Sequence, residues 1–184
     1  MKKVFAFLAD GFEEVECLAV VDLLKRAKVE TIMVSIMDSE IVTGAHGIKV
    51  IADKLYEEVD CSDADLLFLP GGGTGTKNLK AHKELAEKLL EFAKDETKRI
   101  AAICAAPSVL GLLNILNGKK AVCYPGFEEQ LLGAEVVTDG VVTDGRITTA
   151  KGMGVSIELG LELITLLVDK ETSDIIKEQI QSMN

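Results

Sequence analysis

Short apolar runs alternate along the chain with longer segments in which apolar residues recur at helical spacing. The short runs are typical of strands that are buried on both faces of a parallel sheet. They predict strands at residues 4–9, 31–37, 65–69 and 99–103. The longer segments predict helices at residues 12–27, 83–94, 107–116, 155–168 and 171–183. The first of these helices is apolar nearly all round, so both of its faces are expected to pack. Strands and helices in alternation are typical of an α/β fold with a mostly parallel central sheet covered by helices.

Two segments interrupt this alternation. Residues 41–43 and 48–51 flank Gly-Ala-His-Gly at residues 44–47, which predicts a hairpin. Val-Val-Thr-Asp-Gly occurs twice in tandem at residues 136–145, which predicts short strands separated by Asp-Gly turns, a small meander that continues into residues 147–150. No Pro/Ser-rich linker or charge block divides the chain, so residues 1–184 are expected to form a single domain.

Composition excludes several classes of function. The 184 residues carry a formal net charge of −10, which argues against binding to nucleic acid or to an anionic membrane surface. No apolar run reaches the ~18 residues of a membrane span. Asp10 and Gly11 end the apolar N-terminal run too early for a signal peptide, so the cytoplasm is the expected location. The four cysteines show neither zinc-ligand spacing nor the context of a disulfide framework, and no metal or cofactor is expected.

Cys104 ends an apolar strand and is followed by small residues and then by a helix that begins at Pro107. A tight strand-to-helix turn is how α/β folds present a nucleophile, and the helix N-terminus stabilises a thiolate. The alternative interpretation is a buried structural cysteine. Cys17, Cys61 and Cys123 are expected to be structural.

The sequence Pro-Gly-Gly-Gly-Thr-Gly at residues 70–75 follows the strand at 65–69. It is therefore expected at the carboxyl edge of the sheet, where α/β proteins bind ligands. Glycines allow backbone N–H groups to approach an oxyanion closely. The run lacks the Gly-Lys-Ser/Thr ending of a nucleotide-binding loop. An oxyanion-binding loop and a flexible turn remain open.

Glu16 lies on an apolar stripe of the first predicted helix. The apolar members of that stripe are Phe12, Val20, Leu23 and Ala27. A carboxyl group in such surroundings tends to have a raised pKa and to donate or accept protons. The alternative is an acidic side chain that complements the helix dipole in the first turn.

That dipole role suits Glu13 and Glu14 better than Glu16. His46 in the predicted hairpin turn and His82 at a helix start are both expected to be solvated. Neither is placed beside the cysteines by the sequence, so a histidine base for a cysteine nucleophile is not evident.

Four motifs in order extend over almost the whole chain: residues 9–16 (ADGFEEVE), 69–72 (LPGG), 101–107 (AAICAAP) and 151–154 (KGMG). On these motifs the sequence resembles the DJ-1/ThiJ/PfpI superfamily, and its ThiJ branch in particular. The resemblance implies a flavodoxin-like three-layer sandwich, usually dimeric. It also implies a reactive cysteine at Cys104, a partner glutamate at Glu16 and a glycine-loop amide at Gly72.

The sequence departs from the superfamily pattern at three positions. Protease-like members place a histidine directly after the cysteine, where this chain has Ala105, which argues against peptidase activity. Some members have histidine where Tyr124 precedes Pro125, and some have arginine at the position of His46. His46, Tyr124 and Pro125 are therefore candidates for the rim of the substrate pocket.

The activity that the resemblance implies is conversion of 2-oxoaldehydes such as methylglyoxal to 2-hydroxy acids without glutathione, or the related repair of glycated groups. In this hypothesis Cys104 adds to the carbonyl, Glu16 transfers protons, and the backbone N–H groups of Gly72 and Ala105 stabilise the alkoxide. The partner is then a small reactive carbonyl compound. The alternatives are an oxidative-stress sensor or chaperone that acts through oxidation of Cys104 and, less favoured, a cysteine peptidase or amidotransferase-like hydrolase.

Overall fold

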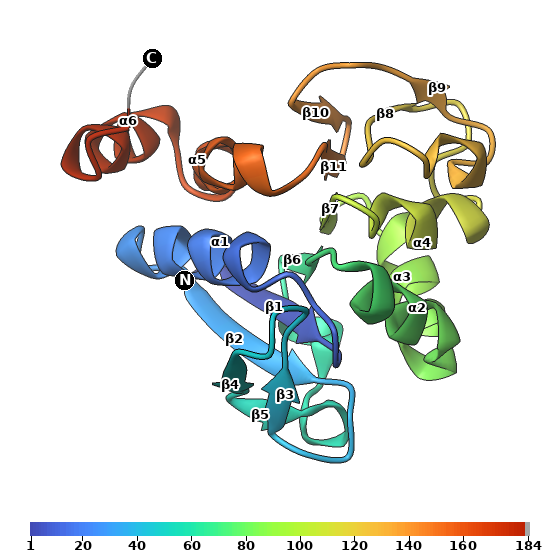
Figure 1. Cartoon of the computed structure of the whole chain (residues 1–184). Helices are drawn as coiled ribbons and strands as arrows, with labels where there is room; N and C mark the ends of the chain where they lie inside the picture. The colour runs from blue at the N-terminus through green and yellow to red at the C-terminus, as the bar shows by residue number, and fades with distance from the viewer. Residues whose placement is uncertain (183–184) are drawn as a thin grey trace.

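The computed structural model describes residues 1–182, so the predicted end of the last helix at Met183 lies outside the described residues. A seven-stranded sheet lies between two layers of helices (Figure 1). Across the sheet its strands are β10 (Val141–Asp144), β11 (Ile147–Ala150), β7 (Arg99–Ile103), β6 (Leu66–Leu69), β1 (Lys3–Leu8), β2 (Glu30–Ser35) and β5 (Lys54–Leu55). All neighbouring strands are parallel except β10 and β11. The predicted α/β class with a mostly parallel sheet is confirmed.

The helices form the two outer layers, as Figure 1 shows. They are α1 (Glu14–Arg26), α2 (Gly73–Ala81), α3 (Lys83–Lys94), α4 (Pro107–Leu112), α5 (Ser156–Leu167) and α6 (Lys170–Gln179). Val4, Ala6 and Leu8 of β1 belong to the core beneath α1 and α5, whereas Phe5 and Phe7 belong to the core beneath α2, α3 and α4. This alternation follows from the two-residue period of a strand, and the sheet is therefore buried on both faces.

The order β2-β1-β6-β7-β11 of the central strands is that of flavodoxin-like folds. In such a sheet the strand order reverses between the first and third strands, here β1 and β6, and ligands bind beyond the carboxyl ends of the strands at that point. The segment that leads from β1 into α1 and the glycine run after β6 both lie there. The fold therefore brings together two of the sequence motifs that are far apart in the chain.

Two predicted elements differ from the structure near the glycine run and the cysteine turn. Helix α2 begins at Gly73, where no helix was expected because Gly and Thr disfavour helices. Helix α4 ends at Leu112 rather than at residue 116. Asn114 has a left-handed φ of 57°, which is incompatible with a continuing helix.

The tandem repeat does not form the predicted meander. Its second copy forms β10, which turns at Gly145 (φ 62°) and pairs antiparallel with β11. From the first copy only Val136 is in a strand, β9 (Glu135–Val136), which pairs with β8 (Lys120–Ala121) outside the main sheet. The predicted hairpin does form, from β3 (Ile41–Thr43) and β4 (Lys49–Ile51). Identical sequence therefore takes two structures because the two copies have different neighbours.

Helix α1 does not pack on all sides as predicted. Val15 and Leu18 are exposed on it, and Ile157 is exposed on α5, the helix that α1 contacts most. Within residues 1–182, no helix combines the length and the apolar character that crossing a membrane requires.

Candidate active site

Cys104 is held in a strained turn between β7 and α4. Its φ of 64° is left-handed, which is unfavourable for a residue with a side chain. Two backbone hydrogen bonds fix the turn: the Cys104 N–H donates to the Ala150 carbonyl at 2.9 Å, and the Tyr124 N–H donates to the Cys104 carbonyl at 2.8 Å. The sequence prediction of a sharp turn before a helix is confirmed, and the thiol is half-buried rather than enclosed.

Glu16 points from α1 to this thiol across the glycine run. Its side chain is buried, and one carboxyl oxygen accepts a hydrogen bond from the Gly71 N–H at 2.9 Å. The carboxyl group also hydrogen-bonds the Cys104 thiol and the Met153 backbone N–H. Burial raises the pKa of Glu16 to about 7, and the charge of Glu13 adds to this effect. The expected buried, titrating carboxyl group is therefore present beside the cysteine.

Backbone amides also contact the sulfur. The N–H groups of Gly72 and Ala105 hydrogen-bond the thiol of Cys104 and lower its pKa. Burial and the negative charge of Glu16 outweigh them and raise the pKa of Cys104 to about 12. The sequence had suggested the opposite direction, because the amides are visible in the motif whereas the burial is not.

These two pKa directions define how the pair handles protons. Near neutral pH the Glu16 carboxyl loses its proton while the thiol keeps its own. A carboxylate then lies in hydrogen-bond contact with an S–H group. That is the arrangement of a nucleophile with its general base, and it needs no histidine.

The glycine run is what allows Glu16 and Cys104 to approach each other. A Cβ at Gly71 would overlap the Glu16 carboxyl oxygen and lie 2.5 Å from Cys104 Cβ. Gly72 has a φ of 91°, and a Cβ there would overlap the backbone of Gly11 and Phe12. The run therefore serves as a close-approach segment. Sequence reasoning named Gly72 but missed Gly71 and the Met153 amide, since a motif does not show which N–H points where.

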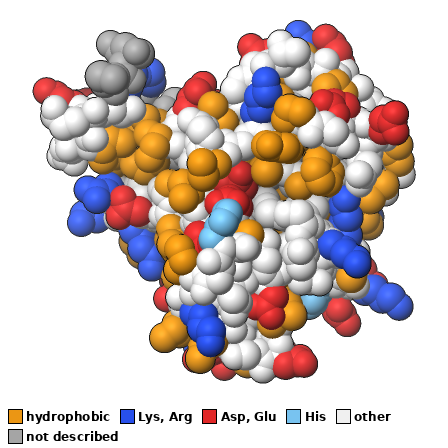
Figure 2. Space-filling view, in the orientation of Figure 1, with side chains coloured by type: hydrophobic (Ala, Val, Ile, Leu, Met, Phe, Trp, Pro, Cys, Tyr) orange, Lys and Arg blue, Asp and Glu red, His pale blue; other side chains and the backbone are white. Residues whose placement is uncertain are grey.

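The predicted rim residues His46, Tyr124 and Pro125 are all exposed. Tyr124 and Pro125 are exposed, and the Tyr124 ring lies 3.2 Å from the Cβ position of Gly152. The Tyr124 backbone therefore hydrogen-bonds Cys104, while the Tyr124 ring lies against the Lys-Gly-Met-Gly motif at residues 151–154. Figure 2 shows a histidine side chain next to acidic side chains, near the middle of the face of the molecule in view.

His46 and Glu14 form a contact that the sequence did not predict. Glu14 is buried and not solvated in the first turn; it accepts hydrogen bonds from the His46 N–H at 2.8 Å and from Nδ1 at 2.9 Å. The His46 ring is exposed as expected, but it is paired. His82 is mostly buried, contrary to expectation, and its Nδ1 accepts from the Leu85 N–H at the start of α3.

Glu13, Glu14 and His46 each offer one ligand atom within 4.8 Å of the others, so among residues 1–182 this group could hold a metal ion. The Glu14 oxygens already accept two hydrogen bonds from His46. A cation here would also lie at the positive end of α1. We assign no metal to this group.

The cysteines differ in access, which gives a first testable prediction. Cys17, Cys61 and Cys123 are buried. Burial raises the pKa of all four thiols, Cys104 included, so access rather than acidity distinguishes them. Cys104 is more exposed and has a carboxylate base in contact. We expect iodoacetamide at pH 7.5 to alkylate Cys104 first, as measured by peptide mass spectrometry over time. Faster labelling of any other cysteine in the folded protein would contradict this placement.

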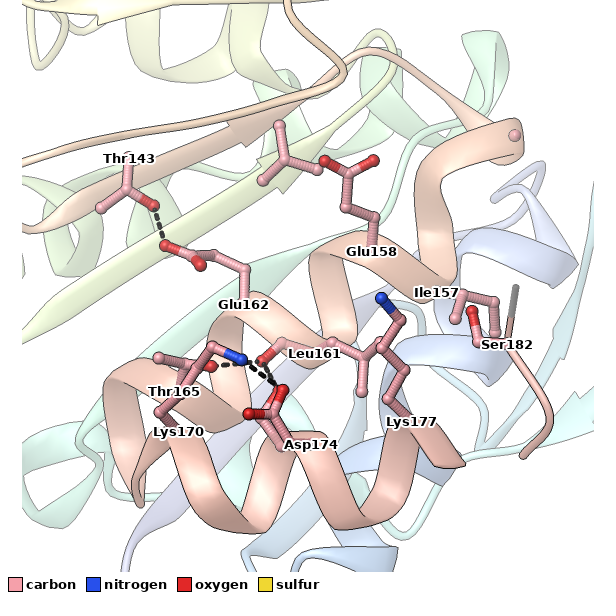
Figure 3. A pocket seen from close by; sticks show the side chains of 13 residues that line it. Thr143, Ile157, Glu158, Leu161, Glu162, Thr165, Lys170, Asp174, Lys177 and Ser182 are labelled. Carbon is pink, nitrogen blue, oxygen red and sulfur yellow. Dashed lines mark hydrogen bonds and ion pairs between the residues drawn. The ribbon is translucent and has the colours of Figure 1, made fainter. Parts of the chain in front are cut away.

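One cavity lies away from this pair. It measures about 590 Å³ and lies between α5, α6 and β10 (Figure 3). Glu162 accepts a hydrogen bond from the Thr143 hydroxyl on one wall, and Lys170 pairs with Asp174 on the other. Neither Cys104 nor Glu16 lines it. This cavity is therefore separate from the Cys104–Glu16 pair.

A family model, several relatives and several solved structures each match most of this chain. The model of the "DJ-1/PfpI family" matches residues 2–166. Protein DJ-1 homolog B of Arabidopsis thaliana is 38% identical over 92% of this chain, which spans only 39% of that relative's length. A deglycase of Pyrococcus abyssi is 33% identical, covering 83% of this chain and 91% of the relative. The solved structure of oxidized Toxoplasma gondii DJ-1 superposes with a TM-score of 0.95 at 34% identity over the full length of both chains.

Proposed function

The chain belongs to the DJ-1/PfpI family, and on that premise we propose that it is an enzyme that converts 2-oxoaldehydes such as methylglyoxal to 2-hydroxy acids without glutathione. The observation that carries the proposal is the contact between the buried carboxyl of Glu16 and the half-buried thiol of Cys104. The P. abyssi relative is named a deglycase, and removal of early glycation adducts would use the same pair.

In the proposed reaction, Cys104 Sγ attacks the aldehyde carbon while Glu16 accepts the thiol proton. Glu16 returns a proton to the alkoxide, which gives a hemithioacetal. The amides of Gly72 and Ala105 donate hydrogen bonds to the developing negative charge. Glu16 then moves a proton from the former aldehyde carbon to the neighbouring carbon, and the hydroxyl proton of the hemithioacetal passes to the neighbouring ketone oxygen. The product is a 2-hydroxy thioester. Water hydrolyses the thioester and frees Cys104, so no external oxidant or reductant is consumed.

The pH dependence follows from the direction of the Glu16 pKa. The base form of Glu16 accepts the thiol proton, and burial raises the pKa of this group to about 7. We expect the rate of lactate formation from methylglyoxal, without glutathione, to rise as pH increases from 5 to 8, with a midpoint near 7. A rate that is flat across this range, or that falls, would exclude Glu16 as the base.

A second candidate function is an oxidative-stress sensor. A half-buried thiol beside a carboxyl group that is partly protonated near neutral pH could form a sulfinate stabilised by a hydrogen bond from Glu16. Peroxide titration followed by mass spectrometry separates the two candidates. An enzyme converts methylglyoxal over many turnovers with Cys104 reduced, whereas a sensor oxidises Cys104 stoichiometrically and produces no lactate.

We also propose that the functional unit is a homodimer. Helix α1 exposes the apolar side chains of Val15 and Leu18. It packs against α5, which exposes Ile157. Ile48 and Ile51 are exposed on the β3–β4 hairpin. Exposed apolar groups on contiguous elements favour a protein–protein contact.

A further inference from the structure

Glu14 is a buried carboxylate that the proposed reaction does not use. Its side chain is only 4% exposed although the residue lies in the first turn of α1. One oxygen accepts the His46 backbone N–H and the other contacts His46 Nδ1. An ionised carboxylate only accepts hydrogen bonds, so Nδ1 carries the hydrogen. A Cβ at Gly44 would overlap the Glu14 carboxylate, so the hairpin loop is shaped to receive it.

The imidazole held in this way lies between two carboxylates. Glu13 Oε1 is 3.7 Å from the same Nδ1 that Glu14 binds. The hydrogen bond that His46 donates to Glu14, and then the charges of Glu13 and Glu14, raise the pKa of His46 above its usual value. The ring therefore keeps its positive charge to higher pH than an unpaired imidazole does.

Glu13 links this cluster to the reacting pair. Its backbone N–H donates to the Gly71 carbonyl at 3.0 Å, and the Gly71 N–H in turn donates to Glu16. The negative charge of Glu13 adds to burial in favouring the protonated form of Glu16. A positive charge on His46 next to Glu13 offsets that effect.

We propose that Glu14 is a positioning residue for the site: it holds His46 against Glu13, so that a proton on His46 shields Glu16 from the charge of Glu13. The proposal rests on the proposed role of Glu16. When His46 loses its proton, Glu16 binds its own proton more tightly, and the activation of Cys104 shifts to higher pH.

The charged and titratable groups that bear on this cluster come from three segments. Those in contact with it or with its hairpin are Glu13, Glu14 and Glu16 at the start of α1, Cys104 after β7, and Asp10, whose carboxylate accepts the Thr43 N–H of the hairpin. Among residues 1–182, His46 is the basic side chain that pairs with Glu13 and Glu14.

The test is the pH dependence of Cys104 alkylation by iodoacetamide. The alkylation rate should rise as Glu16 becomes a carboxylate that accepts the thiol proton, so the midpoint of that rise reports the Glu16 pKa without requiring turnover. We compare the wild type with His46→Gln, whose side chain is exposed and whose folding is therefore not at risk, and with Glu14→Gln. His46→Gln removes the positive charge beside Glu13, and Glu14→Gln removes the hydrogen bond that holds the ring and raises the pKa of His46. We expect each to raise the alkylation midpoint by about half to one pH unit. His82→Asn keeps the acceptor at the start of α3 and should leave the midpoint unchanged.

The decisive comparison repeats His46→Gln in a Glu13→Gln background. If His46 acts by shielding Glu13, its removal there produces no further shift. An unchanged midpoint in His46→Gln alone, or an equal shift in both backgrounds, would overturn the proposal. Absence of methylglyoxal turnover would remove the proposed function but leave this alkylation result intact, so the two failures are distinguishable.

Discussion

Glu16→Gln is expected to lower the turnover of methylglyoxal by roughly 10²–10⁴-fold, the usual effect of losing a general acid–base group. Gln fills the same space and can still accept the Gly71 N–H, so the turn around Cys104 should be retained. It cannot accept the thiol proton. The loss should therefore appear in kcat as well as in kcat/KM, measured as lactate formed without glutathione.

Asp22→Asn is the matched control for this change, because it neutralises an exposed carboxylate on the same helix. Asp22 pairs with Arg26 at the surface, and its removal should leave turnover within about twofold of wild type, since such pairs contribute only ~0.3–0.5 kcal/mol. Wild-type turnover in Glu16→Gln would remove Glu16 from the mechanism.

Glu16→Gln should also be more stable than the wild type at alkaline pH. The folded-state pKa of Glu16 is raised from 4.5 to about 7. The stability that goes with this shift is fully present below pH 4.5 and is lost as pH rises through 7. Glu16→Gln does not titrate, so its advantage in the free energy of unfolding should grow over that interval to about 3 kcal/mol at pH 8. Urea denaturation at pH 5 and pH 8 measures the difference, and equal values at both pH would contradict a buried, titrating Glu16.

Gly71→Ala is expected to abolish turnover and to destabilise the fold by about 1–3 kcal/mol, the usual cost of overpacking. The new methyl group would overlap the Glu16 carboxyl oxygen and lie 2.9 Å from the Ile103 carbonyl oxygen. Relief requires Glu16 and Cys104 to separate, so activity should fall further than stability alone explains.

Gly73→Ala, two residues along the same run, is the matched control. A Cβ at Gly73 would contact no other atom within 4 Å. Gly73 is also the first residue of α2, and Ala is favoured over Gly in helices by up to about 1 kcal/mol. Stability should be unchanged or raised, and turnover retained. Thermal unfolding and lactate assays of the two variants, side by side, distinguish a close-approach segment from a flexible loop, which would tolerate both changes.

The sequence was most informative where one residue's chemistry conflicts with its pattern. Glu16 interrupts an apolar stripe, and Cys104 ends an apolar strand before small residues; both are signals that burial and turn geometry leave in the chain. The mostly parallel pairing of the strands follows from their alternation with helices. The single domain over residues 1–184 and the roles of the site residues stay predictions.

What the sequence could not provide are contacts between distant segments. Glu14 has the pattern of an ordinary first-turn acid, and only the return of the β3–β4 hairpin buries it against His46. The Met153 amide reaches Glu16 from the far end of the chain, and no motif indicates its direction. The raised pKa of Cys104 is likewise a product of burial by several elements.

Lactate formation from methylglyoxal in the absence of glutathione, compared between the wild type and Cys104→Ser, tests the central claim most directly. Serine preserves the turn and its hydrogen bonds but is a far weaker nucleophile beside a base whose pKa is about 7. We predict many equivalents of lactate per wild-type protein and none above the uncatalysed rate for Cys104→Ser. Equal lactate production by the two proteins, or none by either, would contradict the account.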